Sequence, residues 1–298
     1  MANFRDLRLR MRAIRQTLQV TKAMNLISTA KLRKGRRMLE DTEPYFTRIQ
    51  KSMFDILSGA GTVQSNFFMK VSPDKPMHSA VIVITSDRGL AGGYNANIFH
   101  RVNELCSRLK NPLLILIGSI GYRYFEHSPY SILENFSFHS QIPTLESAGE
   151  IAEYIVSQYL WNAFDEVYVV YTHMYSTIRL LPTVRQILPL DAKKIQAELS
   201  AAGNVERVKL NFEFSPSKEE VFDALVPMYI KGSIYGSLVE AYVSEQSARM
   251  TAMDEASKNA EDMLADLQIS YNRVRQAGIT QEMSEIAGGF AALADKES

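Results

Sequence analysis

The sequence predicts an α/β protein in which long helices at the two ends of the chain pair as a coiled coil around a mainly parallel sheet. Three observations predict this fold class. Apolar residues repeat every seven positions over residues 4–39, and a second such repeat lies in the last 71 residues, which contain no proline. Between the repeats, short β-branched runs alternate with helical segments, an order typical of a parallel sheet covered by helices.

The N-terminal helix is predicted because its apolar and small residues step alternately by three and four, as the a and d positions of a coiled coil do. These seam residues are Phe4, Leu7, Met11, Ile14, Leu18, Thr21, Asn25, Ser28, Leu32, Gly35 and Leu39. The middle of the seam is polar, so we expect tight or hydrated packing there. The pattern stops at Pro44, where a proline boundary is expected, and residues 1–58 are assigned to this helical segment.

The central α/β domain is assigned to residues 75–192, because strand-like and helix-like segments alternate there. Strands are predicted at 79–86, 113–117, 131–138, 166–174 and 184–190. Helices are predicted at 95–109, 122–127 and 146–163.

A glycine-rich turn, Gly89–Gly93, follows the first of these strands. Open α/β sheets bind ligands at the carboxyl ends of their strands, and helix N-termini bind anions. The turn is neither a G-x-G-x-x-G fingerprint nor a Walker A loop, which favours a crowded junction that needs small residues. A small-molecule-binding α/β protein that uses this turn remains the alternative function.

Residues 193–212 are predicted to form a polar surface loop, with a short helix at 192–201. A polar connection of this kind is typical of a tolerated surface insertion. A regulatory contact made by this loop with a stationary partner is a separate hypothesis.

The C-terminal segment, residues 213–298, is predicted to hold one long helix that begins at residue 228, after the last proline. Its seam is placed at Met253, Ala256, Ala260, Met263, Leu267, Ser270, Val274 and Ala277. A periodic pattern much longer than about 25 residues favours a coiled coil. Two separate amphipathic helices lying on a globular core are the alternative arrangement.

The two ends of the chain carry opposite charge, although the whole chain is neutral. Residues 1–37 contain eleven basic residues and one acidic residue, whereas residues 228–298 contain six basic and eleven acidic residues. Opposite charge favours pairing between the two helices over pairing of either with a copy of itself. The basic run 31–37 lacks the interleaved aromatic residues of a nucleic-acid site, so no nucleic-acid partner is expected.

Signatures of catalysis, metal binding and membrane insertion are missing from the sequence. It contains no H-E-x-x-H, C-x-x-C or G-x-S-x-G motif. Cys106 stands alone, which excludes an internal disulfide and a multi-cysteine metal site. The apolar runs are too short to span a bilayer, and no secretory signal precedes the first heptad. We therefore expect no catalytic residue, no cofactor and no metal.

Four long motifs identify a family resemblance that covers nearly the whole chain. They are VTKAMNLISTAKLRK at 20–34, TSDRGLAGGYN at 85–95, EQSARMTAMDEASKNAEDM at 245–263 and YNRVRQAGITQEMSEIAGG at 271–289. The sequence resembles the γ subunits of rotary F-type ATP synthases. One departure is Ala91, where the family commonly has cysteine, and the turn needs only a small residue there.

The resemblance implies a long antiparallel, left-handed coiled coil of the terminal helices and a central Rossmann-like domain. It implies a shaft inside a ring of three α and three β subunits, with the globular domain and the ε subunit holding the membrane c ring. Such a chain transmits torque and catalyses nothing itself. We expect it at the cytoplasmic face of a bacterial cell membrane, because nothing resembling a removable presequence precedes the first heptad. A self-contained coiled-coil adaptor remains a further alternative.

The resemblance also implies contact residues between the rotating and stationary parts. These rotor–stator candidates are Lys22, Met24, Arg249, Arg275, Gln276 and Thr280. A tip bearing is implied for Ile286, Phe290 and Leu293, which lie in an uncharged, small or apolar stretch suited to turning in an apolar collar. For each polar candidate, an ion pair within the coiled coil or a simply exposed charge is the alternative.

Overall fold

The computed structural model describes residues 4–59, 63–68, 77–136, 142–177, 179–191 and 214–294, with backbone only at 59 and 289–294. Contacts divide the chain into two units. The body consists of Ser28–Arg249, and the coiled-coil unit consists of Met1–Ile27 with Met250–Ser298. Two long helices contribute to both units: α1 (Phe4–Gly59) and α6 (Lys218–Ala294).

In the coiled-coil unit, α1 and α6 run antiparallel. Phe4 stacks on Tyr271 with ring centroids 4.6 Å apart, whereas the Thr21 hydroxyl lies 2.7 Å from that of Ser257. Leu7 and Met11 are buried. The seam predicted for the N-terminal helix is confirmed in this unit, because its predicted residues are the ones that face α6.

The seam predicted for the C-terminal helix is confirmed at every second position and wrong at others between them. Met253, Ala260, Leu267 and Val274 are buried or partly buried, whereas the predicted Met263, Ser270 and Ala277 are exposed. The observed seam steps by four and three, and its residues are Met253, Ser257, Ala260, Leu264, Leu267, Tyr271 and Val274. Apolar residues occur at exposed as well as buried positions of this helix, so contacts with α1 rather than hydropathy select the seam.

The body contains a five-stranded sheet in the order β3-β2-β1-β4-β5. Its strands are β1 (Ser79–Ile84), β2 (Pro112–Ile117), β3 (Ser131–Phe136), β4 (Glu166–Met174) and β5 (Leu180–Leu188). The first four pair in parallel, and β5 pairs antiparallel with β4 at one edge. The mainly parallel sheet predicted from the sequence is confirmed. All residues of β1 are buried, as expected for a central parallel strand.

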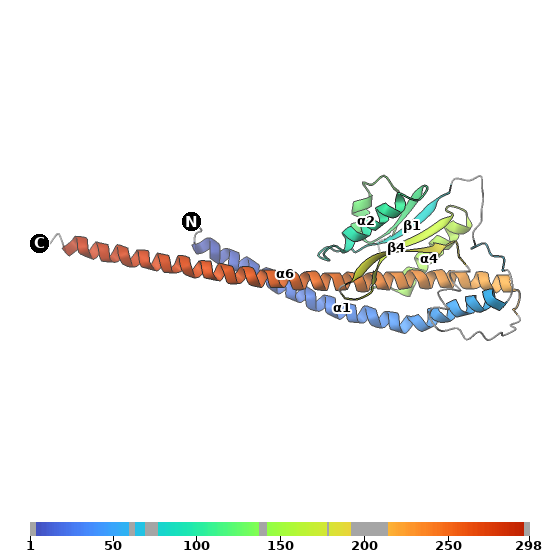
Figure 1. Ribbon diagram of the computed structural model, residues 1–298, viewed down its shortest axis with the longest axis horizontal. Coiled ribbons are helices and arrows are strands. Elements are labelled where there is room, and N and C mark those ends of the chain that lie inside the picture. The colour runs from blue at the N-terminus through green and yellow to red at the C-terminus, as the bar shows by residue number, and fades with distance from the viewer. Residues whose placement is uncertain are drawn as a thin grey trace. The chain divides into compact units, whose positions relative to one another are not determined.

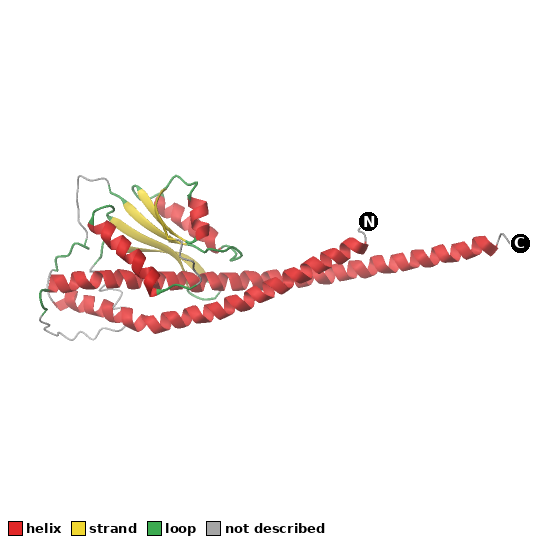
Figure 2. Cartoon of the chain, turned by 180° about the vertical axis from the view of Figure 1, so that it is seen from behind, coloured by secondary structure: helices red, strands yellow, loops and turns green. Residues whose placement is uncertain are grey.

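In the described part of the chain, three shorter helices connect the strands: α2 (Tyr94–Cys106), α3 (Ser119–Phe125) and α4 (Leu145–Leu160). Side chains of α2 and α3 share one hydrophobic cluster with alternate residues of β1 and β2, among them Val81, Val83, Leu114 and Leu116. Right-handed crossovers then require α4 on the opposite face, and Figures 1 and 2 show α2 and α4 on either side of the sheet. Thr144 caps α4 by accepting a hydrogen bond from the backbone of Ser147.

Close helix packing in the body depends on small residues. A side chain at Gly35 of α1 would meet Val243 and Tyr242 of α6, with a Cβ only 2.6 Å from the Val243 side chain. A side chain at Gly232 would overlap the ring of Phe46. These positions therefore admit only glycine at the present helix separation.

Both prolines that were expected to bound helices lie inside them. Pro44 is inside α1, and Pro227 lies ten residues into α6. A helical proline removes one backbone hydrogen bond. Packing offsets that cost, because Phe222, Val226 and Ile230 around the second proline are fully buried. The predicted loop 193–212 and the predicted helix 192–201 lie outside the described residues.

Candidate functional site

Hydrogen bonds between residues close in sequence hold the glycine-rich turn of the body in place. The Ser86 hydroxyl donates to the carbonyl of Arg88 over 2.9 Å, and the Asn95 amide donates to the Ser86 hydroxyl over 2.7 Å. Leu90 and Gly92 both adopt positive φ angles, of 64° and 56°. The turn is thus tightly folded, and it presents the Leu90 side chain, 62 % exposed, to the outside.

Arg249 of α6 binds this turn. Its guanidinium donates to the carbonyl oxygens of Arg88 and Gly89 over 3.0 and 3.2 Å. A third contact is an ion pair of 2.7 Å with Glu245, one helical turn earlier, and both side chains are largely buried. Burial raises the pKa of the Glu245 carboxyl above its ordinary value of 4.5, and the Arg249 charge opposes that shift. A buried charged cluster therefore joins the turn to α6. Glu245 and Arg249 are four residues apart, a spacing that brings two side chains together on one face of a helix.

A chamber of about 570 Å³ lies beside the turn, at the carboxyl ends of β1 and β2. Open α/β sheets place small-molecule sites at this edge, and the volume is in the range of such sites. Its walls include Ile84, Ile117 and Leu238, with Lys31 and Glu245 among its polar groups. The turn itself offers its carbonyls to Arg249 instead of backbone donors to a phosphate, which favours the junction interpretation of the glycines.

Two of the rotor–stator candidates lie on α1 in the coiled-coil unit. Lys22 forms an ion pair of 2.6 Å with Glu261, and both side chains are about half exposed. Such exposed pairs contribute little stability, so the ammonium stays available to a partner. Met24 is partly buried next to the seam.

The remaining candidates of this unit lie on α6, past the last contact with α1. Residues 275–288 are exposed without exception, including Arg275, Gln276 and Thr280. The Thr280 hydroxyl donates to the Gln276 carbonyl over 2.9 Å, a bond within the helix. Their side chains therefore face outward from a helix without a second helix beside it in the described part of the chain.

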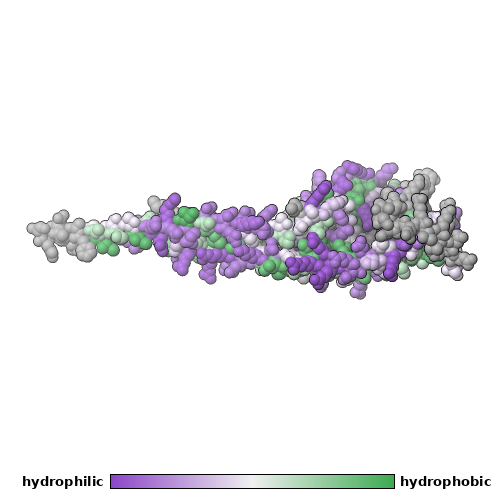
Figure 3. All heavy atoms as spheres, turned by 60° about the horizontal axis from the view of Figure 1, so that its bottom comes forward, coloured by the Kyte–Doolittle hydropathy of each residue, from purple (hydrophilic) through white to green (hydrophobic). Residues whose placement is uncertain are grey.

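The tip candidates are placed only in part. Ile286 is 61 % exposed, and Ile279 and Met283, which precede it on the same helix, are 48 % and 66 % exposed. Figure 3 shows hydrophilic side chains over the paired helices and paler or hydrophobic ones toward the described end of α6. The side chains of Phe290 and Leu293 lie outside the described residues.

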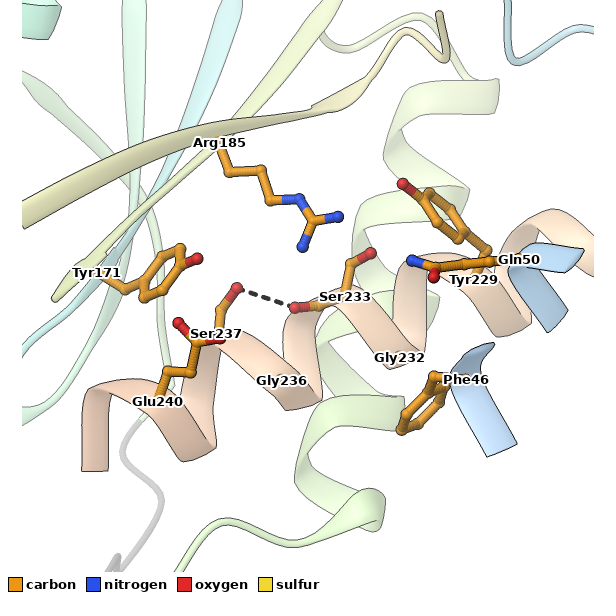
Figure 4. A pocket seen from close by; sticks show the side chains of 10 residues that line it. All are labelled: Phe46, Gln50, Tyr171, Arg185, Tyr229, Gly232, Ser233, Gly236, Ser237 and Glu240. Atoms are coloured by element: carbon orange, nitrogen blue, oxygen red, sulfur yellow. Dashed lines mark hydrogen bonds between the residues drawn. The ribbon is translucent and has the colours of Figure 1, made fainter. Parts of the chain in front are cut away.

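Arg249 differs from the other candidates because it belongs to the body and is buried there. Sequence reasoning also missed several polar residues that the body brings together around a small cavity. Arg185 of β5 points toward Ser233 of α6, and Tyr229 lies one turn before Ser233 on the same helix (Figure 4). Because Arg185 is far from the other two residues in sequence and none of the three belongs to a motif, no pattern indicated that they lie together.

The described ranges hold no cluster of three or more His, Cys, Asp or Glu side chains able to bind a metal ion. None of the helices described has an apolar stretch long enough to cross a membrane.

Long terminal helices that pair in a coiled coil, together with a mainly parallel α/β body, define the class of protein. The family model described as ATP synthase matches residues 3–293. Within that class, this chain belongs to the ATP synthase gamma chains. It is 44 % identical over 292 residues to the gamma chain of Ruminiclostridium cellulolyticum, covering 98 % of this chain and 99 % of that one.

Two further gamma chains align over almost their full length. The gamma chain of Acetivibrio thermocellus is 41 % identical, with 98 % of this chain and all of that relative covered. The chain described as sodium ion specific in Acetobacterium woodii is 37 % identical, with 98 % and 99 % covered.

A solved structure shares the fold. A chain of the mitochondrial ATP synthase of Euglena gracilis, from an OSCP/F1/c-ring assembly in rotational state 3, matches with a TM-score of 0.66 at 17 % identity. The match covers 99 % of this chain and 96 % of that one.

Proposed function

We propose that this chain is the central rotor shaft of an F-type ATP synthase. It transmits torque between a membrane c ring and a ring of three α and three β subunits, and so couples ion translocation to ATP synthesis or hydrolysis. The observation that carries the proposal is the match to gamma chains over nearly the whole length of both proteins. The chain is a non-catalytic subunit, so its own chemistry is limited to contacts that form and break as it turns.

The construction of the coiled-coil unit supports a torque-bearing role. Two helices locked by a buried hydroxyl pair, Thr21 and Ser257, and by the ring stack of Phe4 on Tyr271 resist twisting better than one helix. In the body, Arg249 ties α6 to the turn after β1. Torque applied to the body therefore reaches α6 through bonds that are shielded from water.

The rotor–stator contacts are assigned to side chains that are exposed and able to form hydrogen bonds. Arg275 and Lys22 are cations that can form charge-assisted hydrogen bonds with carboxylates of β subunits at some rotary angles and release them at others. Gln276 and Thr280 add neutral hydrogen bonds. Arg249 is assigned to this group by family resemblance, and its guanidinium also has partners within the body, so we propose that it acts by holding the turn.

The partners and the location complete the proposal. The body binds the ε subunit and the c ring, which keeps the chain at the cytoplasmic face of a bacterial cell membrane as a peripheral component. The apolar end of α6, with Ile286, Phe290 and Leu293, turns inside an apolar collar formed by the α and β subunits.

Rotation in a reconstituted complex tests the shaft directly. The chain is co-expressed with α and β subunits, and a bead is attached to a cysteine introduced at Trp161, which is 77 % exposed on the body. The only native cysteine, Cys106, is buried and does not compete for the label. We expect an α3β3γ complex whose bead turns in one direction when ATP is added. A complex that hydrolyses ATP while the bead stays still would contradict the proposal.

The contact assignment has its own test in the complete ATP synthase, reconstituted in lipid vesicles with its c ring. Removing the residues after Thr280 together with Arg275→Ala and Gln276→Ala should abolish ATPase activity. Arg275→Ala alone should reduce ATP-driven ion pumping more than ATP hydrolysis, because the contact transmits force and does not bind nucleotide. Arg273→Ala is the matched control, since that residue is also exposed and lies on the same helix. Equal effects of the two arginine substitutions would refute the assignment.

A further inference from the structure

Serine hydroxyls join one stretch of α6 in the body to the α/β domain. The Ser244 hydroxyl donates to the carbonyl of Thr172 in β4 over 2.8 Å. The Ser247 hydroxyl donates to the carbonyl of Thr177, which follows the same strand, over 3.2 Å. Both serines are 0 % exposed. Two positions within one turn of α6 are therefore bonded to the end of β4 by donors that solvent does not reach.

These two bonds differ from those of other buried serines in the same helix. A helical serine has a near acceptor in the carbonyl four positions earlier. Ser237 and Ser257 donate to that carbonyl, over 2.9 and 2.8 Å, and Figure 4 shows the bond of Ser237 as a dashed line. Ser244 and Ser247 donate to a different element, so their hydroxyls link α6 to the sheet.

The carbonyl that Ser244 binds is buried at a point where the neighbouring strands offer no donor. Thr172 lies opposite Pro182 in the pairing of β4 with β5, and proline has no N–H to donate. On the other side of β4, the register with β1 ends at Val170. Buried backbone carbonyls need a hydrogen-bond donor, so the Ser244 hydroxyl takes the place of a donor from the sheet.

A third bond reaches the same stretch of α6 from α2. The Tyr94 hydroxyl donates to the carbonyl of Ala241 over 3.2 Å, and Tyr94 is buried. Burial, followed by the Glu245 charge, raises the pKa of Tyr94 above its ordinary value of 10.0, so this hydroxyl keeps its proton and remains a donor. Residues 241–247 are thus held by bonds from α2, from β4 and from the chain that follows β4.

Apolar packing also holds this part of α6, because Val239 and Val243 are buried. The hydrophobic effect is non-directional, so it keeps a helix against a sheet without fixing how far the helix is turned or shifted. Hydrogen bonds have preferred distances and angles, and burial strengthens them. The serine bonds are therefore the contacts that resist rotation of α6 about its own axis relative to β4.

We propose that Ser244 and Ser247 are positioning residues of the rotor, whose hydroxyls fix the register of α6 against β4 and so make the body turn with the helix. This inference rests on the proposed shaft function and names where the body takes up torque. Arg249 holds α6 to the glycine-rich turn, whereas the two serines hold it to β4 and the residues after that strand. The serines contact no nucleotide, so their loss should loosen the angular link and leave ATP turnover intact.

The test uses the α3β3γ complex with the bead on the body. Bead angles are recorded at an ATP concentration low enough for rotation to pause between binding events, and the rate of ATP hydrolysis is measured in parallel. The double variant Ser244→Ala, Ser247→Ala should hydrolyse ATP at the unchanged rate. Its bead angles within a pause should have a larger variance than those of the unsubstituted complex, because a softer link allows larger thermal fluctuations. Each single variant should give an intermediate variance.

Ser237→Ala is the matched control, because Ser237 is also buried in α6 and its hydroxyl bonds only within the helix. Its variance should equal that of the unsubstituted complex. Equal variances for the control and the double variant would overturn the inference, and if the double variant does not assemble, the single variants decide in the same way. In that case the unsubstituted bead still rotates, so the shaft proposal stands. An unsubstituted bead that does not rotate would overturn both.

Discussion

At the scale of single residues, Arg249 makes more interactions than an exposed arginine on a helix surface makes. It is 7 % exposed, it pairs with Glu245, and it binds two carbonyls of the glycine-rich turn. Replacing one member of a buried pair leaves the other charge without compensation, which costs more than the pair contributes. The residue is thus a structural link of the body as well as a candidate for coupling.

Arg249→Gln should destabilise the chain by about 3 kcal/mol, because the buried Glu245 carboxylate then loses its ion-pair partner. The thermal midpoint is expected to fall by several degrees in calorimetry. Lys258→Gln is the control, since the Asp254–Lys258 pair has the same i,i+4 spacing on the same helix but is mostly exposed. We expect no measurable change for that variant. Equal midpoints for the two variants would show that the buried pair does not stabilise the fold.

The loss caused by Arg249→Gln should also depend on pH. The pKa of Glu245 is already raised above 4.5 by burial, and removing the cation raises it further. A carboxyl with a raised folded-state pKa favours folding in its protonated form, and that advantage disappears as the pH rises through the folded-state value. The variant should therefore lie closer to the unsubstituted chain at pH 5 than at pH 8. A pH-independent difference between the two proteins would exclude Glu245 as the cause.

At the scale of elements, the seam of α6 is defined by contact with α1. Leu264 is partly buried and Met263 is 56 % exposed, although both are apolar and adjacent. Leu264→Ser should weaken the coiled-coil unit by about 1 kcal/mol, roughly half the value of a fully buried leucine. Hydrogen exchange of the α1 amides in residues 7–21 should accelerate accordingly. Met263→Ser should leave hydrogen exchange unchanged. The opposite ranking of the two variants would place Met263 in the seam, as predicted from the sequence.

Two glycines one turn apart in α6 should respond oppositely to alanine. Gly236→Ala adds a methyl group to open space and removes the helix penalty of glycine, so stability should rise by about 0.5–1 kcal/mol. Gly232→Ala overlaps the Phe46 ring and should lower stability by about 1 kcal/mol or more. Denaturant midpoints measure both changes. A gain at both positions would mean that the two helices can move apart without cost.

At the scale of the whole molecule, the shaft proposal requires that the two helices of the coiled-coil unit turn together. Cysteines introduced at Thr21 and Ser257 replace hydroxyls 2.7 Å apart and should form a disulfide on oxidation. ATP hydrolysis and bead rotation in the reconstituted complex should survive this cross-link. Reduced samples of the same variant are the control. Rotation that stops on oxidation and resumes on reduction would show that the helices slide past each other during turnover.

Much of the fold follows from local patterns in the sequence. The β-branched runs produced strands at β1, β2 and β4 close to their predicted limits, and the heptads of the first helix marked the residues that are buried, such as Leu7 and Met11. Proline boundaries were less informative. Pro44 and Pro227 both remain inside helices. At Pro227, the buried residues Phe222, Val226 and Ile230 provide packing that outweighs one lost hydrogen bond.

The sequence by itself determined the two long helices, the mainly parallel sheet and the family, because heptads, β-branched runs and long motifs are local. Only the tertiary structure decided the seam of α6, the antiparallel edge strand β5, the burial of Arg249 and the cavity around Arg185. Each of these depends on contacts between residues far apart in the chain. Thr21 and Ser257 are 236 residues apart in the sequence, and only the pairing of the two helices brings their hydroxyls within 2.7 Å of each other.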